Sequence, residues 1–410
     1  MKDINIFTLS NGIRIVHKET PDATVAHCGF LIDVGSRDED DHQQGLAHYI
    51  EHVLFKGTKK RKAFHILNRL DAVGGEINAY TTKESTCIFA SFLTEHFERA
   101  FELLKDITFD SVFPEKEIER EKDVIIDEIN SYLDSPSEQI FDDFEDQIFR
   151  GHPLGRNILG TIKSVRNFTR EDVLSFIAKH YTPHRIVFSV VGNFKASYVE
   201  KLAGKYLADI KEKENLYQRK IFKGYKPNVQ VQKKTTFQAH FTLGNVAYSR
   251  KNKKKIPLVL LNNMLGGPAM NSRLNLAIRE KYGYTYNLES NYSAYSDTGL
   301  FSVYLGTDNQ FLDKTINLVK KELYKFSEKK LGTLQLHYGK KQLIGQIAMA
   351  QENKAGLMLA IGKSLLYTGK VETLKDIFSK IENISAEELH SVANEIFNEK
   401  EFSSLTYLAK

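Results

Sequence analysis

Two periods of hydrophobic and polar positions alternate along the first half of the chain. Residues 5–35 and 76–93 alternate at every second position, which is typical of half-buried strands, and Asn11–Gly12 is a frequent turn between paired strands. Other segments repeat apolar positions at helical spacing, namely residues 48–52, 62–75, 94–109 and 114–133. The pattern therefore predicts paired strands interleaved with helices.

The second half repeats this order of segments. Residues 228–249 resemble the early strands, and residues 283–308 match the later strand pair of the first half. Residues 256–267 stand where the helix around residues 48–52 stood. Because the offset is about 210 residues, the size of one domain, an internal duplication is the economical explanation.

The duplication predicts an α+β fold with two homologous domains, each an antiparallel sheet packed with helices. We expect these domains at residues 1–209 and 227–410, joined by a charged and weakly periodic linker at residues 210–226. Residues 356–364 resemble a phosphate-binding loop, but they have one residue too many between their glycines and lie in an apolar helical pattern. We interpret them as a core helix.

The composition of the 410 residues limits the classes of function. Hydrophobic residues make up 41%, enough for a core that is usually divided into two domains at this length. The 57 Lys and Arg are interspersed with 52 Asp and Glu, so the net charge of +5 predicts no nucleic-acid-binding surface. Cys28 and Cys87 are too few for a disulfide framework, and no apolar run approaches the roughly 20 residues that span a bilayer. We therefore expect a cytoplasmic protein without nucleic-acid or membrane partners.

The segment GLAHYIEHVLFKGT, residues 45–58, combines three chemically active groups. His48 and His52 are four positions apart, so on a helix both imidazoles can bind one metal ion. Glu51 lies beside that face, where its carboxylate could take a proton from a water molecule. The alternative is a pair of core histidines hydrogen-bonded to a glutamate, a purely structural arrangement.

A third metal ligand has to come from another element. Glu121 and Glu128 are seven residues apart in the helix predicted at 114–133, so they share one face and either could reach the metal. In the second copy, Asn262 and Asn263 align with the glutamate and the second histidine of the first copy. The second copy therefore lacks the chemistry of the first.

These motifs resemble the M16 family of zinc metallopeptidases, an insulinase-like or pitrilysin-like family that carries the inverted H-x-x-E-H motif and includes the mitochondrial processing peptidases. The resemblance covers nearly the whole chain and rests on GLAHYIEHVLFKGT, GGEINAYTT, EREKDVIIDEI, GHPLGRNILG and NSRLNLAIREKYGYTYN. It implies the LuxS/MPP-like metallohydrolase fold and one Zn²⁺ per chain, bound by His48, His52 and Glu128. It also implies that Glu51 is the general base and that Glu121 supports the site without binding metal.

The resemblance extends to residues that would handle the substrate. Arg273 and Tyr286 of the second domain match an arginine and a tyrosine that hold the scissile peptide and stabilise its developing oxyanion. Asn78, Ala79 and Tyr80 match an exposed edge strand, to which an extended peptide adds through main-chain hydrogen bonds. An ordinary edge strand without a ligand is the alternative for this segment.

The function implied is zinc-dependent cleavage of unfolded or short peptides held in a chamber between the domains. Because the chain carries both halves of the chemistry, we expect a homodimer, with a heterodimer containing a related subunit as the other possibility. One competing hypothesis is a non-catalytic family member that binds peptides or scaffolds a complex. Another is a metal-activated hydrolase that acts on substrates other than peptides.

Overall fold

The computed structural model describes residues 4–214 and 217–410. The chain forms two compact units, and each unit combines segments from both halves of the sequence. Unit 1 comprises Met1–Ile129, Arg156–Arg219 and Met349–Thr373; unit 2 comprises Asn130–Gly155, Lys220–Ala348 and Leu374–Lys410. Each unit thus takes one segment from outside the contiguous ranges 1–209 and 227–410 that the sequence predicts.

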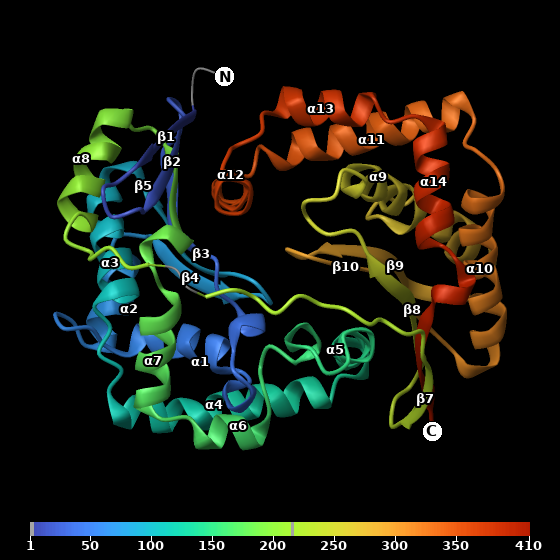
Figure 1. Ribbon diagram of the computed structural model, residues 1–410, viewed down its shortest axis with the longest axis horizontal. Helices are drawn as coiled ribbons and strands as arrows, with labels where there is room; N and C mark the ends of the chain where they lie inside the picture. Colours follow the sequence, from blue (N-terminus) through green and yellow to red (C-terminus); the bar gives the residue numbers. More distant parts are fainter. Residues whose placement is uncertain (1–3, 215–216) are drawn as a thin grey trace. The chain divides into compact units, whose positions relative to one another are not determined.

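Unit 1 is built on a six-stranded sheet (Figure 1). Its strands are β1 (Ile4–Thr8), β2 (Arg14–Glu19), β3 (Val25–Ile32), β4 (Glu76–Thr81), β5 (Thr86–Leu93) and β6 (Ile186–Gly192). They lie in the order β1-β2-β6-β3-β5-β4, and every neighbouring pair is antiparallel except β2 and β6. β1 and β2 form the hairpin predicted around Asn11 and Gly12, where Gly12 has a φ of 94°. β4 pairs only with β5 and is an edge strand.

Both faces of this sheet are covered. Helices on one face share a large core with the sheet: α1 (Leu46–Val53), α2 (Ala63–Asp71), α3 (Phe97–Phe109), α4 (Glu115–Leu133), α6 (Ile162–Asn167), α7 (Arg170–His180) and α8 (Ala196–Leu207). The other face packs against a single helix, α12 (Lys354–Thr368), which comes from the second half of the chain (Figure 1). Successive strand residues serve the two faces alternately, so Phe30 belongs to the large core and Leu31 to the α12 cluster.

Unit 2 repeats this architecture. Its strands are β7 (Val229–Lys234), β8 (Ala239–Ala247), β9 (Thr285–Ala294), β10 (Gly299–Thr307) and β11 (Ser403–Ala409), in the order β7-β11-β8-β10-β9. The β7–β11 pair is parallel and the others are antiparallel, so the sheet matches β2-β6-β3-β5-β4 of unit 1 strand for strand. This correspondence, with helices packed on each sheet, confirms the predicted α+β fold with two related domains.

The helices of unit 2 also cover both faces of the sheet. Five α-helices contribute to one core: α9 (Lys255–Gly266), α10 (Leu312–Glu328), α11 (Thr333–Ala350), α13 (Leu374–Glu382) and α14 (Ala386–Ile396). The other face packs against α5 (Pro136–Ile148), which comes from the first half of the chain. A short π-helix, η7 (Asn275–Glu280), follows α9.

The chain passes from unit 1 to unit 2 at three points, and one of them, between Arg219 and Lys220, falls inside the predicted linker. The described linker residues, 210–214 and 217–226, form neither helix nor strand, and residues 215–216 lie outside the described part of the chain. Arg219 ends the unit 1 segment and binds the carboxylates of Asp33 and Asp38. Within the described ranges, no helix has the length and apolar character needed to cross a membrane.

Candidate metal centre

The helix that carries the H-x-x-E-H motif begins at a point fixed by tertiary contacts. Gly45, just before α1, has a φ of 92°, and a Cβ there would lie 2.5 Å from the carbonyl oxygen of Leu159, so only glycine fits. No side chain of α1 itself caps this end. Instead, the buried carboxylate of Glu39 accepts hydrogen bonds from the backbone N–H groups of Gly45 at 2.9 Å and Ala47 at 2.8 Å. This carboxylate therefore sets the register at which α1 starts.

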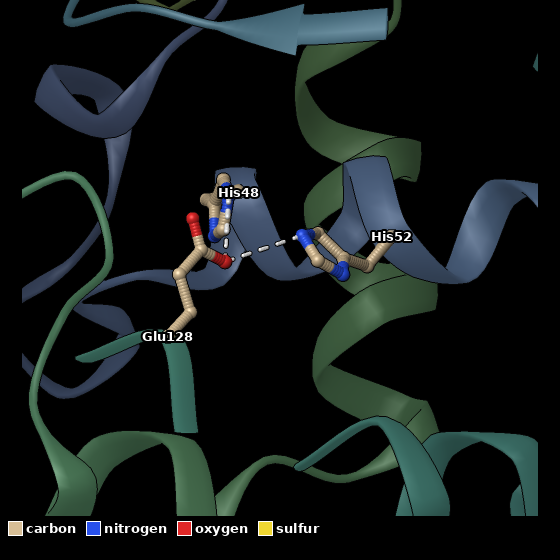
Figure 2. Close-up of side chains that lie close together, drawn as sticks. All are labelled: His48, His52 and Glu128. Atoms are coloured by element: carbon tan, nitrogen blue, oxygen red, sulfur yellow. Dashed lines mark ion pairs between the residues drawn. The ribbon is translucent and has the colours of Figure 1, made fainter. Parts of the chain in front are cut away.

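His48 and His52 project from α1 toward the same point, and Glu128 of α4 points at it from the opposite side (Figure 2). One carboxylate oxygen, Glu128 Oε2, lies 3.8 Å from His48 Nε2 and 3.6 Å from His52 Nε2. The candidate ligand atoms of the three residues all lie within 4.8 Å of one another. In the part of the chain that the structure describes, no other group of three such residues is this close.

The spacing of these atoms fits a tetrahedral metal ion. Donor atoms bound to zinc at about 2.0–2.1 Å lie about 3.3 Å apart, a few tenths of an ångström less than the two separations from Glu128 Oε2. The separations are also too long for direct hydrogen bonds between the imidazoles and the carboxylate. Burial, and secondarily His52, lowers the pKa of His48 to about 4, so its imidazole is neutral near pH 7, the form that binds metal.

Glu51 sits on α1 beside the three candidate ligands and is not one of them. Among the described residues, its Oε2 atom is buried without a hydrogen-bond partner. Burial raises the pKa of Glu51, while Thr81 and His52 beside it lower the pKa and Glu128 raises it. A half-buried carboxylate with a free oxygen and a raised pKa is suited to accept and return a proton.

Glu121 lies two turns before Glu128 on α4 and contacts the far side of the His52 ring. Its Oε1 atom is 3.0 Å from His52 Nδ1, and its Oε2 atom is 2.6 Å from the ammonium group of Lys56. Burial alone would raise the pKa of Glu121, but the contacts with His52 and Lys56 outweigh burial and lower it. An ionised Glu121 can only accept, so His52 Nδ1 carries the proton and Nε2 presents its lone pair toward Glu128.

Lys56 was not identified from the sequence. It ends the short 3-10 helix η3 (Leu54–Lys56) that directly follows α1. Its position four residues after His52 was the available signal, but the 3-10 turn of η3 departs from α-helical spacing, so this signal did not place the lysine. The sequence alone offered no way to tell this lysine from the other basic residues that follow it.

The predicted substrate strand is β4, whose outer edge has no partner strand in the described sheet. Asn78 is exposed, and Ala79 packs against the core that contains α1. Tyr80 faces the other side of the sheet, where its ring contacts Phe89 and lies under the ammonium group of Lys363 at 5.1 Å. The three predicted residues thus share one edge strand but point to different faces.

Arg273 and Tyr286 both belong to unit 2. Arg273 lies two residues before the π-helix η7, and its guanidinium group lies 3.9 Å from the centre of the Phe326 ring. Burial lowers the pKa of Arg273, and nearby Glu322 opposes that shift. Tyr286 lies on the edge strand β9, and its side chain is 80% exposed. Within its unit, then, the tyrosine is available to a ligand, whereas the arginine is stacked against an aromatic ring.

The chain is similar to known proteins along nearly its whole length. The family model described as "Insulinase (Peptidase family M16)" matches residues 14–162, and the one described as "Peptidase M16 inactive domain" matches residues 167–343. An uncharacterised zinc protease of Bacillus subtilis is 33% identical over 403 residues, covering 97% of this chain and 96% of its own length. An uncharacterised zinc protease of Rickettsia felis is 34% identical over 399 residues, with coverage of 97% and 96%.

Two solved structures share the fold. A Pseudomonas fluorescens structure described as a peptidase M16 inactive domain aligns with a TM-score of 0.92 at 18% identity, covering 100% of this chain and 98% of that one. A protease from Helicobacter pylori aligns with a TM-score of 0.88 at 22% identity, covering 99% of each chain. Since two models of one family together match most of the sequence, and relatives named as zinc proteases align along nearly all of it, the chain belongs to peptidase family M16.

Proposed function

We propose that this protein is a zinc-dependent endopeptidase that cleaves unfolded or short peptides. The observation that carries the proposal is the convergence of His48, His52 and Glu128 on one point, with the free carboxylate oxygen of Glu51 beside them. Zinc bound by these three residues would act as a Lewis acid that polarises a peptide carbonyl and acidifies a water molecule. The names of the relatives as zinc proteases support the same metal and reaction class.

The chain's own residues supply the remaining steps. Glu51 would take a proton from the attacking water and pass it to the leaving amine, which balances the proton over the cycle. His52, oriented by Glu121, and the neutral His48 would hold the metal. A substrate peptide would add to the free edge of β4, so that its main chain is held extended beside α1. Arg273 and Tyr286 would bind the substrate from unit 2, as the family resemblance implies.

Glu51→Gln tests the assignment of the base. We expect the variant to retain one zinc ion per chain while its kcat/KM for an unstructured peptide falls by on the order of 10³-fold or more, because amide nitrogen and oxygen cannot exchange the proton. The measurements are metal analysis of the purified protein and mass-spectrometric mapping of peptide cleavage. His52→Ala is the contrasting variant, since it should lose both the zinc and the cleavage.

Three results would contradict the assigned residues or the metal, and two further results would contradict the endopeptidase activity. Near-normal cleavage by Glu51→Gln would remove Glu51 from the mechanism. Stoichiometric zinc in His52→Ala would contradict the ligand assignment, and so would cleavage that persists after a chelator has removed all metal. Peptide binding without turnover by the zinc-loaded wild type would instead support a non-catalytic family member. Zinc binding with turnover of other substrates but no peptide in a library would support a different hydrolase.

We further propose that the protein is a homodimer, as the presence of both halves of the chemistry in one chain suggests. The alternative is a heterodimer in which a related subunit is required for activity. Sedimentation of the purified chain, combined with the cleavage assay, distinguishes these arrangements. A chain that cleaves peptides only after addition of a second subunit would contradict the homodimer.

A further inference from the structure

Side chains of α1 and η3 contact side chains of α4 at two successive positions around the candidate metal centre. On α1, His48 and His52 are four positions apart and share one face, and Lys56 ends the 3-10 helix η3 that continues from α1. On α4, Glu121 and Glu128 are two turns apart and also share one face. Glu128 is near both histidines, whereas Glu121 contacts His52 and Lys56. The three candidate metal ligands therefore adjoin a second group of contacts, which joins Glu121 to His52 and Lys56.

In this second group of contacts, both oxygens of the buried Glu121 carboxylate have a partner. The Glu121 side chain is only 7% exposed; its Oε1 atom lies 3.0 Å from His52 Nδ1 and its Oε2 atom 2.6 Å from Lys56 Nζ. A carboxylate bound at one oxygen can still turn about its side-chain torsions, which are broad for glutamate. Bound at both oxygens, it has one orientation, and the His52 ring that it contacts is fixed with it.

We propose that Lys56 is a positioning residue for the metal site. Its ammonium group holds Glu121 in the orientation in which the carboxylate fixes the His52 ring, and this raises the affinity of the site formed by His48, His52 and Glu128 for zinc. The inference rests on the proposed metal-dependent function, but it assigns to Lys56 a role in metal binding that does not depend on the substrate.

The charge of Lys56 and its geometry predict opposite effects on metal affinity. As a positive charge close to the site, Lys56 repels a divalent cation, so a purely electrostatic role predicts tighter zinc binding when it is removed. As the second contact of Glu121, Lys56 keeps a metal ligand oriented, so a positioning role predicts weaker binding when it is removed. The sign of the change in zinc affinity therefore distinguishes the two roles.

The test is the zinc Kd of the full chain, measured by competition with a chromogenic chelator. We expect Lys56→Met, which keeps the aliphatic stem, to weaken zinc binding by roughly 10- to 100-fold, the usual effect of losing a group that orients a metal ligand. Lys56→Arg should restore the Kd to within about threefold of wild type, because guanidinium also donates to a carboxylate. Lys60→Met, which removes a more exposed lysine of the following loop, is the charge-matched control and should leave the Kd unchanged.

A double-mutant cycle with Glu121→Gln tests whether Lys56 acts through Glu121. If it does, adding Lys56→Met to Glu121→Gln should weaken zinc binding no further. An equal effect of Lys56→Met in both backgrounds would overturn the proposal, and so would zinc binding by Lys56→Met that is as tight as in wild type or tighter. Urea unfolding checks that each variant is folded, and Lys56→Gln replaces Lys56→Met in both comparisons if the latter is not.

These outcomes are separable from failure of the proposed function. A wild-type chain that binds no zinc would contradict the metal site itself. A wild-type chain that binds and uses zinc, together with a Lys56→Met variant of unchanged Kd, would contradict only the role of Lys56.

Discussion

At the scale of single residues, His180 links the charge state of a buried ring to the stability of unit 1. Its Nδ1 atom lies 3.1 Å from the Arg185 guanidinium, so this nitrogen must accept a hydrogen bond and the ring must be neutral. The ring also packs against Phe176 and Tyr217. Burial lowers the pKa of His180 to about 4, while Asp38 raises it and Arg185 lowers it further.

This shift predicts a loss of stability in acid. In the unfolded chain His180 titrates near its ordinary pKa of 6.5, whereas the folded chain takes up this proton only near pH 4. The contribution is therefore complete above pH 6.5 and is lost as the pH falls toward 4, by at most about 3 kcal/mol. Urea unfolding at several pH values, with a chelator present, should show a shallower pH dependence for His180→Gln than for wild type. Identical slopes between pH 7 and 4 would contradict this prediction.

The residues of the metal centre show how far spacing alone can define a site. The four-residue interval of His48 and His52 was enough to predict that both rings face one point. The choice between Glu121 and Glu128 stayed open at that stage, because both lie on one face of α4. The structure separates them by the offset of α4 along α1, which brings Glu128 to the Nε2 atoms and Glu121 to Nδ1 of His52. That offset depends on core packing between the helices, which no local pattern encodes.

At the scale of elements, the start of α1 depends on a residue outside the helix. Glu39 accepts from two backbone N–H groups of the first turn through two different oxygens, and its side chain is almost fully buried. A glutamine offers one acceptor oxygen, and its NH₂ group would face an N–H donor. Burial raises the pKa of Glu39 to about 8, so the comparison belongs at pH 9, where Glu39 is ionised. There we expect Glu39→Gln to lower the free energy of unfolding by about 1–3 kcal/mol, the usual effect of leaving a buried donor unpaired.

Urea unfolding of purified Glu39→Gln, monitored by circular dichroism, measures this change. Glu352→Gln is the matched control, because Glu352 is exposed and belongs to the same unit. It should leave the unfolding midpoint within experimental error of wild type. If both variants unfold at the wild-type midpoint, the N-terminus of α1 does not depend on this carboxylate.

Most elements could be predicted because their signals are local. The β1–β2 turn is marked by Asn11 and Gly12, and the helix expected from Pro114 onward is α4, which begins at Glu115. The segment 356–364 is confirmed as core helix, since it lies in α12. The start of α1 was harder to define, because the cap is supplied by Glu39 rather than by a residue adjoining the helix. A capping group outside the helix does not appear in the periodic pattern of apolar residues that predicts the helix.

At the scale of the whole molecule, the duplication is visible in the sequence but the exchange of helices is not. The strand orders of the two units match as the repeated segments predict. However, α5 and α12 each pack on the sheet of the unit built mainly from the other half of the chain. The apolar pattern of α12 shows that it is buried, but hydrophobic burial is non-directional and does not specify a sheet. The shape of the contact surface decides on which sheet α12 packs. Gly362 lies so close to Leu31 and Ser189 of the unit 1 sheet that a Cβ there would come within 3 Å of both.

The exchange predicts that unit 1 cannot be isolated as a contiguous fragment. A fragment of residues 1–219 keeps the contacts of Arg219 but lacks α12, so one face of its sheet is left uncovered. The apolar side chains exposed on that face would be Val16, Leu31, Cys87, Val187 and Val191. Because an exposed apolar surface of this kind promotes association, we expect the fragment to bind a hydrophobic dye strongly and to self-associate in sedimentation. A synthetic peptide of residues 349–373 should reduce both effects but not abolish them, because the fragment also contains α5 without the unit 2 sheet that covers it. The same peptide with Met358, Ile361 and Leu365 changed to serine should leave both effects unchanged. A fragment that is monomeric and binds no more dye than the full chain would show that α12 is dispensable for unit 1.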